Sequence, residues 1–178
     1  RRRTELHARV GGLLEARRSG GGDRFADLEA LGHHFSLSDE PARGARYLVA
    51  AGDWARGIYA NDDAIRLYQR ALTALSACSD SDPNEVLDIG ERLGDLFGPT
   101  GQREQAFAHY GRVLDSARQA GDRPRAARIQ RKLAGLHWDA GARERSRECL
   151  DAGLELLAGL DNQIETAHLL QEVGRFAF

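Results

Sequence analysis

Apolar residues recur at steps of three and four along most of the chain, which is the spacing of one buried face of an α-helix. The segment with Ile65, Tyr68, Leu72 and Leu75 shows this spacing well. No stretch sustains the alternation of apolar and polar residues that is typical of a half-buried strand. Ala, Leu, Arg, Glu and Gln, all strong helix formers, dominate the composition. The pattern therefore predicts an all-α protein.

Turn and capping residues divide this pattern into nine segments. Asp82 followed by Pro83 is typical of a helix start, because a capping carboxylate precedes a proline in the first turn. Gly101, Gly121 and Gly141 fall where helices should end. The predicted helices run over residues 2–18, 24–37, 41–58, 61–77, 84–98, 102–119, 123–139, 143–158 and 162–178. The short loops between them favour antiparallel neighbours.

The chain repeats itself every 40 to 42 residues, and one repeat is a pair of helices. The first helix of each pair carries a small residue where its partner must cross it closely, namely Gly52, Gly94, Ala134 and Gly174. The second helix carries a large residue, namely Tyr68, Tyr110 and Leu150. Such pairs bury their apolar faces by stacking on their neighbours. The sequence thus predicts a superhelical solenoid of antiparallel helix pairs.

The order of small and large residues within a repeat resembles the tetratricopeptide repeat (TPR). Ala51-Gly52, Ala55, Ala64, Tyr68 and Ala71-Leu72 carry the resemblance best. The period of 40 to 42 residues differs from the usual 34, and Leu48, Gly90 and Gln130 stand where Trp is usual. The resemblance implies a right-handed superhelical array of extended TPRs over 41–178, with repeats at 41–82, 83–121, 122–160 and a truncated 161–178. Residues 1–40 would form an N-terminal helical pair at a junction to a preceding domain.

Residues Leu31–Phe35, Asp39–Tyr47 and Tyr59–Ala64 are similar to a junction that follows the ATPase module of certain bacterial signalling proteins. Those proteins join the ATPase to a class III adenylate or guanylate cyclase domain or to a LuxR-type regulator domain. The resemblance implies a regulatory module from such a parent, which would carry the ATPase and cyclase activities. The chain contains no Met, so we expect an internal segment of a larger cytoplasmic protein.

Composition excludes several classes of partner. The 25 basic and 27 acidic residues give a net charge of −2, whereas a general nucleic-acid binder is normally strongly basic. No apolar run approaches the ~20 residues of a membrane span. Two cysteines are too few for a disulfide scaffold and favour a reducing compartment. We therefore expect neither nucleic acid nor membrane as a partner.

The resemblance implies that the first helices of the pairs line a concave groove. Its candidate residues are Arg46, Asp53, Arg56, Asp88, Glu91, Asp95, Arg128, Arg131, Trp138, Gln171 and Arg175. Their charges alternate in sign, which favours a protein or peptide segment of mixed charge, or a neighbouring domain of the same chain. Trp138 would be an aromatic anchor. In the alternative interpretation Trp138 belongs to the core, and Asp88 pairs with Arg128 and Glu91 with Arg131.

A run of basic residues in the third repeat has two interpretations. It comprises Arg123, Arg125, Arg128, Arg131 and Lys132, followed by Arg143, Arg145 and Arg147. The run is either a phosphate or nucleic-acid contact, or one side of ion pairs between neighbouring repeats. The second interpretation is favoured, because aromatic residues that would stack on bases do not alternate with the cations.

No motif indicates catalysis, a cofactor or a metal. His33 and His34 are adjacent, and adjacent side chains on a helix point apart, so we expect packed histidines rather than ligands. The run Gly20–Gly22 lacks the Lys-Ser/Thr of a phosphate-binding loop and is expected to be a connector. We therefore expect a non-enzymatic binding module without cofactor or metal.

The helix predicted over 162–178 aligns with the first helix of a pair and has no second helix after it. An apolar face near Val173, Phe176 and Phe178 should therefore be uncovered. We expect this face to be buried against a crystal neighbour or against a second copy, which would form a homodimer through the last helix. The alternative function is thus an oligomerisation module with no separate ligand.

Overall fold

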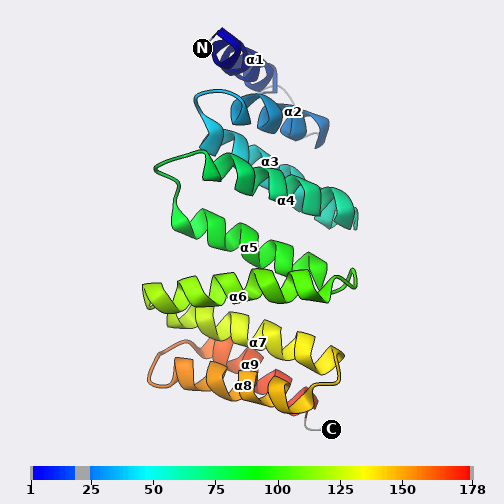
Figure 1. The fold of residues 1–178 in the computed structure, drawn as a ribbon, viewed down its shortest axis with the longest axis vertical. Coiled ribbons are helices and arrows are strands. Elements are labelled where there is room, and N and C mark those ends of the chain that lie inside the picture. Colours follow the sequence, from blue (N-terminus) through cyan, green and yellow to red (C-terminus); the bar gives the residue numbers. More distant parts are fainter. Residues whose placement is uncertain (1, 19–24, 177–178) are drawn as a thin grey trace. The chain divides into compact units, whose positions relative to one another are not determined.

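The computed structural model describes residues 2–18 and 25–176, which form nine α-helices and contain no strand within those ranges (Figure 1). The helices are α1 (Arg2–Arg18), α2 (Phe25–Ser36), α3 (Pro41–Gly57), α4 (Asn61–Ser76), α5 (Pro83–Phe97), α6 (Arg103–Ala120), α7 (Arg123–Asp139), α8 (Arg143–Leu157) and α9 (Gln163–Phe176). The predicted all-α class of helix pairs is confirmed. The expected connector at Gly20–Gly22 lies outside the described residues, as does Phe178.

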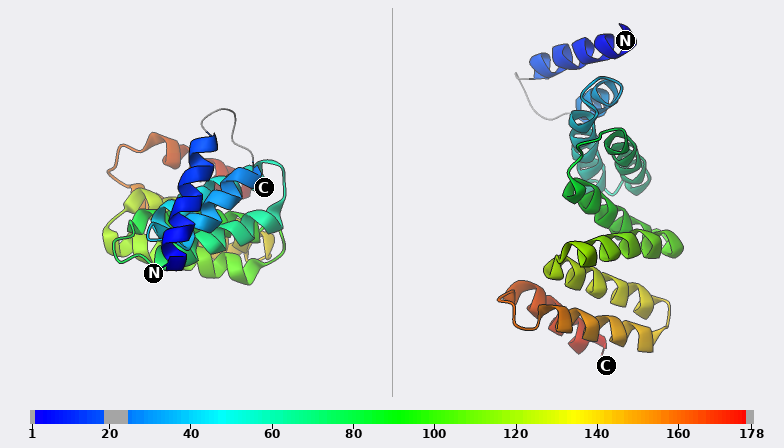
Figure 2. Two further views of the ribbon diagram at one scale, coloured as in Figure 1. Left: turned by 90° about the horizontal axis from the view of Figure 1, so that it is seen from above. Right: turned by 60° about the vertical axis from the view of Figure 1, so that its left-hand side comes forward.

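The chain divides into two compact units, Arg1–Arg92 and Leu93–Phe178, with the division inside α5. In the first unit α2, α3 and α4 pack in sequence order, and α3 and α4 run antiparallel side by side (Figures 1 and 2). In the second unit α7 packs along α8, and α9 contacts both of them. None of the helices in the described ranges combines the length and the apolarity that crossing a membrane requires.

The helix ends follow the capping residues of the sequence. The backbone N–H of Asn84 donates to Asp82 Oδ1 at 2.9 Å, one residue after Pro83 opens α5. Gly101, Gly121 and Gly141 adopt positive φ angles of 80°, 71° and 76°. A residue with a side chain is strained at such angles, so glycine is the natural residue after a helix. These ends keep the loops short and the paired helices antiparallel.

Close crossings at two glycines hold the first two pairs together. A Cβ on Gly52 would lie 2.6 Å from Tyr68 Cε1, and a Cβ on Gly94 would lie 2.4 Å from Tyr110 Cε1. Neither distance leaves room for a methyl group, so only glycine fits beneath the tyrosine rings. Both rings are buried, as the repeat pattern predicted.

The crossing residues of the third and fourth repeats differ from those of the first two repeats. Ala134 and Leu150 are buried in one cluster with Leu169, so an alanine–leucine contact replaces the glycine–tyrosine crossing. Gly174 occupies the equivalent position on α9, which the sequence analysis expected to lack a covering second helix. No atom outside its own helix lies within 4 Å of the place where its Cβ would be, because no described helix covers that side of α9.

Candidate functional site

A hydrogen-bonded group of three side chains extends the glycine crossing of the first unit. The Tyr68 hydroxyl donates to Asp53 Oδ1 at 2.6 Å, and Arg92 of α5 forms an ion pair with the same oxygen. Burial, followed by the hydrogen bond to the Asp53 carboxylate, raises the pKa of Tyr68 to about 12. Tyr68 therefore remains a neutral donor, and it fixes the carboxylate that receives Arg92.

The second unit repeats this arrangement. The Tyr110 hydroxyl donates to Asp95 Oδ1 at 2.7 Å, and Lys132 Nζ of α7 donates to the same oxygen at 2.5 Å. In both units the aspartate directly follows the crossing glycine, and the cation comes from the first helix of the next pair. Asp53 and Asp95 thus each connect one helix pair to the next, through the tyrosine of their own pair and the cation of the following pair. We call this group of tyrosine, aspartate and cation a joint.

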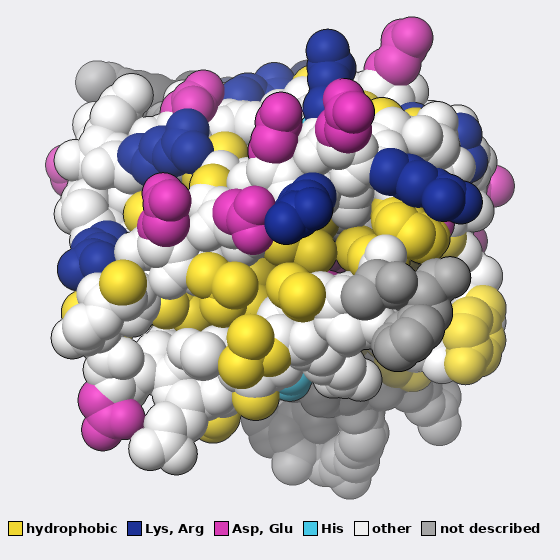
Figure 3. Space-filling view, turned by 90° about the horizontal axis from the view of Figure 1, so that it is seen from below, with side chains coloured by type: hydrophobic (Ala, Val, Ile, Leu, Met, Phe, Trp, Pro, Cys, Tyr) yellow, Lys and Arg dark blue, Asp and Glu magenta, His cyan; other side chains and the backbone are white. Residues whose placement is uncertain are grey.

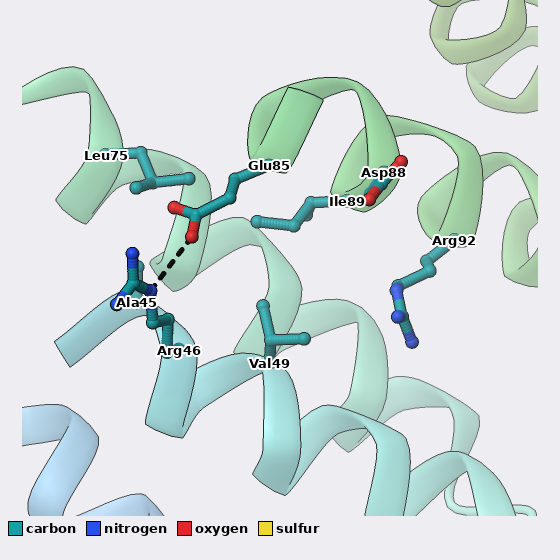
Figure 4. Close-up of a pocket in the computed structure, with 8 residues that line it drawn as sticks. All are labelled: Ala45, Arg46, Val49, Leu75, Glu85, Asp88, Ile89 and Arg92. Carbon is teal, nitrogen blue, oxygen red and sulfur yellow. Dashed lines mark hydrogen bonds and ion pairs between the residues drawn. The ribbon is translucent and has the colours of Figure 1, made fainter. Parts of the chain in front are cut away.

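A recess between α3 and α5 is the candidate binding site of the first unit. We call it the α3–α5 recess; its main lining residues are Arg46, Val49, Glu85, Asp88, Ile89 and Arg92. Its volume is about 160 Å³. Figure 4 shows Val49 and Ile89 at its floor, facing each other from the two helices.

Charged side chains border this apolar floor. Arg46 Nε donates to Glu85 Oε1 at 2.9 Å across one end of the recess, and Arg92 extends toward α3 at the other end (Figure 4). The Arg46 side chain is 71% exposed, so its ion pair with Glu85 contributes only ~0–1 kcal/mol and can be exchanged for a ligand contact. The recess therefore offers a small apolar surface between charges of both signs.

The predicted groove residues of the first unit divide into those that line this recess and those that do not. Arg46 and Asp88 line it, whereas Asp53 is engaged by Tyr68 and Arg92. Arg56 and Glu91 do not line it. Sequence reasoning missed Glu85 and Arg92, although they stand four residues before and three after Ile89 and so share its helix face.

In the second unit the predicted groove charges contact neighbours within the fold. Arg131 Nε donates to Glu165 Oε1 at 2.8 Å, and Glu165 is buried. Arg175 forms an ion pair with Glu172 at 2.6 Å, one helical turn away on α9. Gln171 is exposed on the same helix. The expected pairs Asp88–Arg128 and Glu91–Arg131 would join the two units and remain predictions.

Trp138 is half-buried and stacks on another aromatic ring. Its centroid lies 4.3 Å from that of Phe176, with only 8° between the ring planes. The guanidinium of Arg143 lies 5.2 Å from the Trp138 centroid, within the range of a cation–π contact. The indole thus connects α7, α8 and α9, and it borders a surface groove that Phe176 also lines.

The basic run of the third repeat is largely engaged inside the fold. Arg125 contacts Asp122 at 3.3 Å, and Arg123 donates to the carbonyl oxygen of Ala158 at 3.0 Å. Arg131 and Lys132 bind the carboxylates described above. The Arg131 and Lys132 contacts support the interpretation of the run as one side of ion pairs between neighbouring repeats, whereas those of Arg123 and Arg125 lie within the third repeat.

A third histidine joins the adjacent pair on α2. His7 Nδ1 of α1 lies 3.0 Å from His34 Nδ1, and the His33 and His34 rings are 5.3 Å apart. Burial, then the neighbouring His33 and His7, lowers the pKa of His34. The described residues contain no group of three or more His, Cys, Asp or Glu side chains that could hold a metal ion. The argument that adjacent side chains on a helix point apart did not predict this cluster, because its third member, His7, lies 27 residues before His34.

Comparisons with known proteins concern the fold. The sequence matches no family model and no curated protein. Among solved structures, BtubC (BKLC) from P. vanneervenii has a TM-score of 0.62 at 18% identity over 98% of this chain, which spans 64% of BtubC. MamA has a TM-score of 0.53 at 15% identity, over 80% of this chain and 84% of MamA.

A third similar structure is a kinesin light chain from Podosopora anserina with nearly identical TPR-like repeats. Its TM-score is 0.53 at 16% identity, over 90% of this chain and 88% of that protein. At such identities the likeness concerns the fold and not the function. The helix pairs, the glycine crossings and these neighbours together show that the chain has an all-α helical repeat fold of the TPR-like kind.

Proposed function

We propose that the chain is a non-catalytic protein-interaction module whose α3–α5 recess receives a peptide segment of mixed charge. One observation carries the proposal: Val49 and Ile89 form an apolar floor between Arg46, Glu85 and Arg92. A peptide with one apolar side chain between an acidic and a basic residue matches this surface. The partner is a separate protein or a neighbouring domain of the same polypeptide.

Selection from a library of random peptides displayed on phage tests this proposal. The full chain is the bait, and we expect enriched peptides to carry an apolar residue flanked by charges of both signs. Val49→Lys, which places a cation on the apolar floor, should reduce binding of these peptides at least tenfold. The matched control is Gln69→Lys on α4, which adds the same charge at an exposed position outside the recess. Equal binding by both variants would reject the recess as the site.

The parent protein is a further part of the proposal. The similarity at Leu31–Phe35 and Asp39–Tyr47 supports a regulatory role in a cytoplasmic bacterial signalling ATPase, linked to a cyclase or LuxR-type domain. The sequence of the full-length gene tests this directly. A gene without an ATPase domain next to these helices would remove the regulatory role and leave the interaction module.

Self-assembly is the second candidate function. Val173 is 37% exposed on α9, which favours burial of this face against another molecule, as in a homodimer. Light scattering of the full chain over a hundredfold range of concentration measures the mass. A mass that stays at 19.6 kDa throughout would reject self-assembly.

A further inference from the structure

The turn between α3 and α4 holds a tyrosine where the corresponding turns of the next two pairs hold glycine. Tyr59 has a φ angle of 62°, and Gly101 and Gly141 at the same repeat position have φ angles of 80° and 76°. A bulky side chain rarely adopts this left-handed backbone, because its Cβ approaches the following carbonyl oxygen. Within the described ranges, Tyr59 is the one residue other than glycine with a positive φ.

Hydrogen bonds show that this turn is built like the glycine turns. The backbone N–H of Tyr59 donates to the carbonyl oxygen of Arg56 at 3.0 Å, and the N–H of Ala60 donates to that of Ala55 at 2.9 Å. In both glycine turns the same two donors bind the carbonyl oxygens three and five residues earlier, respectively. Glycine would therefore suit this turn better than tyrosine. A strained residue of this kind indicates a role for its side chain outside the fold.

The ring of Tyr59 is 88% exposed, so it contributes little to the core. Ile58 and Trp54 are also exposed, at 55% and 42%. These two residues are four apart and therefore share one side of the end of α3, and the tyrosine follows directly. In the next two pairs the position of Trp54 is occupied by buried leucines, Leu96 and Leu136. We call the three exposed residues Trp54, Ile58 and Tyr59 the aromatic turn.

The exposure of the aromatic turn does not arise from a missing helix of its own pair. Both α3 and α4 are present, and α2 packs on α3, where Phe25 stacks on Trp54 with 4.8 Å between the ring centroids. Exposed apolar side chains also occur elsewhere, and Figure 3 shows a band of them, bordered by charged side chains, on the face that it views. The aromatic turn differs because it combines exposure with a backbone conformation that tyrosine rarely adopts.

The charges near the aromatic turn favour a basic partner. The guanidinium of Arg66 is shared by Glu29 at 2.8 Å and Asp63 at 3.0 Å. Arg56, three residues before the tyrosine, also has an interaction within the chain. Asp62 is exposed in the first turn of α4 and takes part in neither pair of Arg66. An exposed carboxylate close in sequence to an exposed aromatic ring complements a cation through both groups.

We propose that the aromatic turn binds a segment of a partner protein in which an arginine or lysine adjoins an apolar residue. The cation lies over the Tyr59 ring and pairs with Asp62, and the apolar residue packs on Trp54 and Ile58. The chain itself contains a contact of the first kind, since an arginine of α8 lies 5.2 Å from the centroid of an indole ring. The α3–α5 recess is lined by other residues, so the two proposals can fail independently.

Selection from random twelve-residue peptides displayed on phage tests this proposal, with the wild-type and Tyr59→Gly chains as parallel baits. We expect peptides enriched on the wild type to carry an arginine or lysine beside an apolar residue. By fluorescence anisotropy, these peptides should bind Tyr59→Gly about tenfold more weakly, because the ring is lost. Tyr59→Phe, which keeps the ring, is the matched control and should retain binding. The recess variant Val49→Lys should also bind them like the wild type, whereas Asp62→Asn should bind them more weakly.

Thermal melting separates a binding role of the ring from a structural one. Because glycine suits the left-handed turn, Tyr59→Gly should melt at the wild-type temperature or above it. A lower melting temperature would show that the ring stabilises the fold, and would overturn the proposal. Equal peptide binding by the wild-type and Tyr59→Gly chains, or enriched peptides without a cation, would overturn it as well. A concentration-dependent dimer that disappears in Tyr59→Gly would instead identify a second copy as the occupant.

Discussion

Single residues determine how closely paired helices approach, and the glycines beneath the tyrosines show this most directly. The Tyr110 ring occupies the space where a side chain on Gly94 would begin. Gly135, in α7, has no neighbouring atom within 4 Å of its Cβ position. The same substitution at these two glycines therefore separates the effect of packing from the effect of helix propensity.

Gly94→Ala should destabilise the chain by about 1–3 kcal/mol, because the new methyl group overlaps the Tyr110 ring and separates α5 from α6. Gly135→Ala should instead stabilise it by about 0.5–1 kcal/mol, because alanine is a better helix former than glycine. Urea denaturation monitored by circular dichroism measures both changes. Equal midpoints for the two variants would contradict the close crossing.

His109 makes stability depend on pH. Its ring stacks on Phe97, with centroids 5.4 Å apart, and burial followed by the charge of Arg112 lowers its pKa to about 4. The unfolded state binds a proton near pH 6.5 and the folded state only near pH 4, so acid favours unfolding. The contribution of His109 is complete above about pH 6.5 and is lost as pH falls toward 4.

His109→Gln should therefore reduce the loss of stability between pH 6.5 and pH 4, by about 1 kcal/mol after allowance for partial exposure of the ring. Denaturation midpoints measured at pH 7, 5.5 and 4.5 check this. A wild-type slope in the His109→Gln variant would show that the ring is not held neutral.

At the scale of elements, helix starts differ in whether a side chain caps them. Asp122 precedes α7, and its Oδ1 accepts the backbone N–H of Arg125 at 3.0 Å. Asn162 does the same for Glu165 at the start of α9, at 3.2 Å. Gln102, before α6, makes no such side-chain bond. The starts of α7 and α9 thus depend on one side chain each, whereas the start of α6 does not.

Asp122→Ala should cost about 1 kcal/mol, because it leaves a backbone donor of the first turn of α7 without its acceptor and removes a negative charge from the helix N-terminus. Gln102→Ala should change stability by less than about 0.5 kcal/mol. Differential scanning calorimetry compares the two variants. A larger loss for Gln102→Ala than for Asp122→Ala would mean that the cap is not what stabilises the start of α7.

Most helix boundaries were predictable, because the sequence signals that determine them are local. The start at Pro83 and the end before Gly121 were predicted within a residue or so, since capping and left-handed turns involve neighbours in sequence. Gly52 beneath Tyr68 was predictable from the repeat, because one spacing recurs. The contacts of Asp53 with Arg92 and of His7 with His34 were missed, because each joins helices far apart in sequence and depends on side-chain direction.

At the scale of the whole molecule, the repeated fold was predictable and the binding surface only in part. The nine helices found within residues 2–18 and 25–176, and their pairing, follow from the periodicity of the chain. The predicted set of groove residues did not distinguish residues that line a recess, such as Arg46, from residues that connect successive helix pairs, such as Asp95. Both kinds are charged and occupy helix positions of the same type. The two kinds of residue differ in which side chains of the neighbouring helices are long enough to contact them.

The joint formed by tyrosine, aspartate and cation has a consequence for how such a chain can grow. One joint uses the guanidinium of Arg92 and the next uses the ammonium of Lys132, each on an aspartate after a glycine. If about forty residues were duplicated in tandem, the aspartate of the new repeat would contact the cation of the repeat after it. The cation of the new repeat would contact the aspartate of the repeat before it. Lengthening by entire modules thus needs no newly evolved contact, whereas a short insertion within α5 would shift Arg92 and Asp95 out of register with their partners.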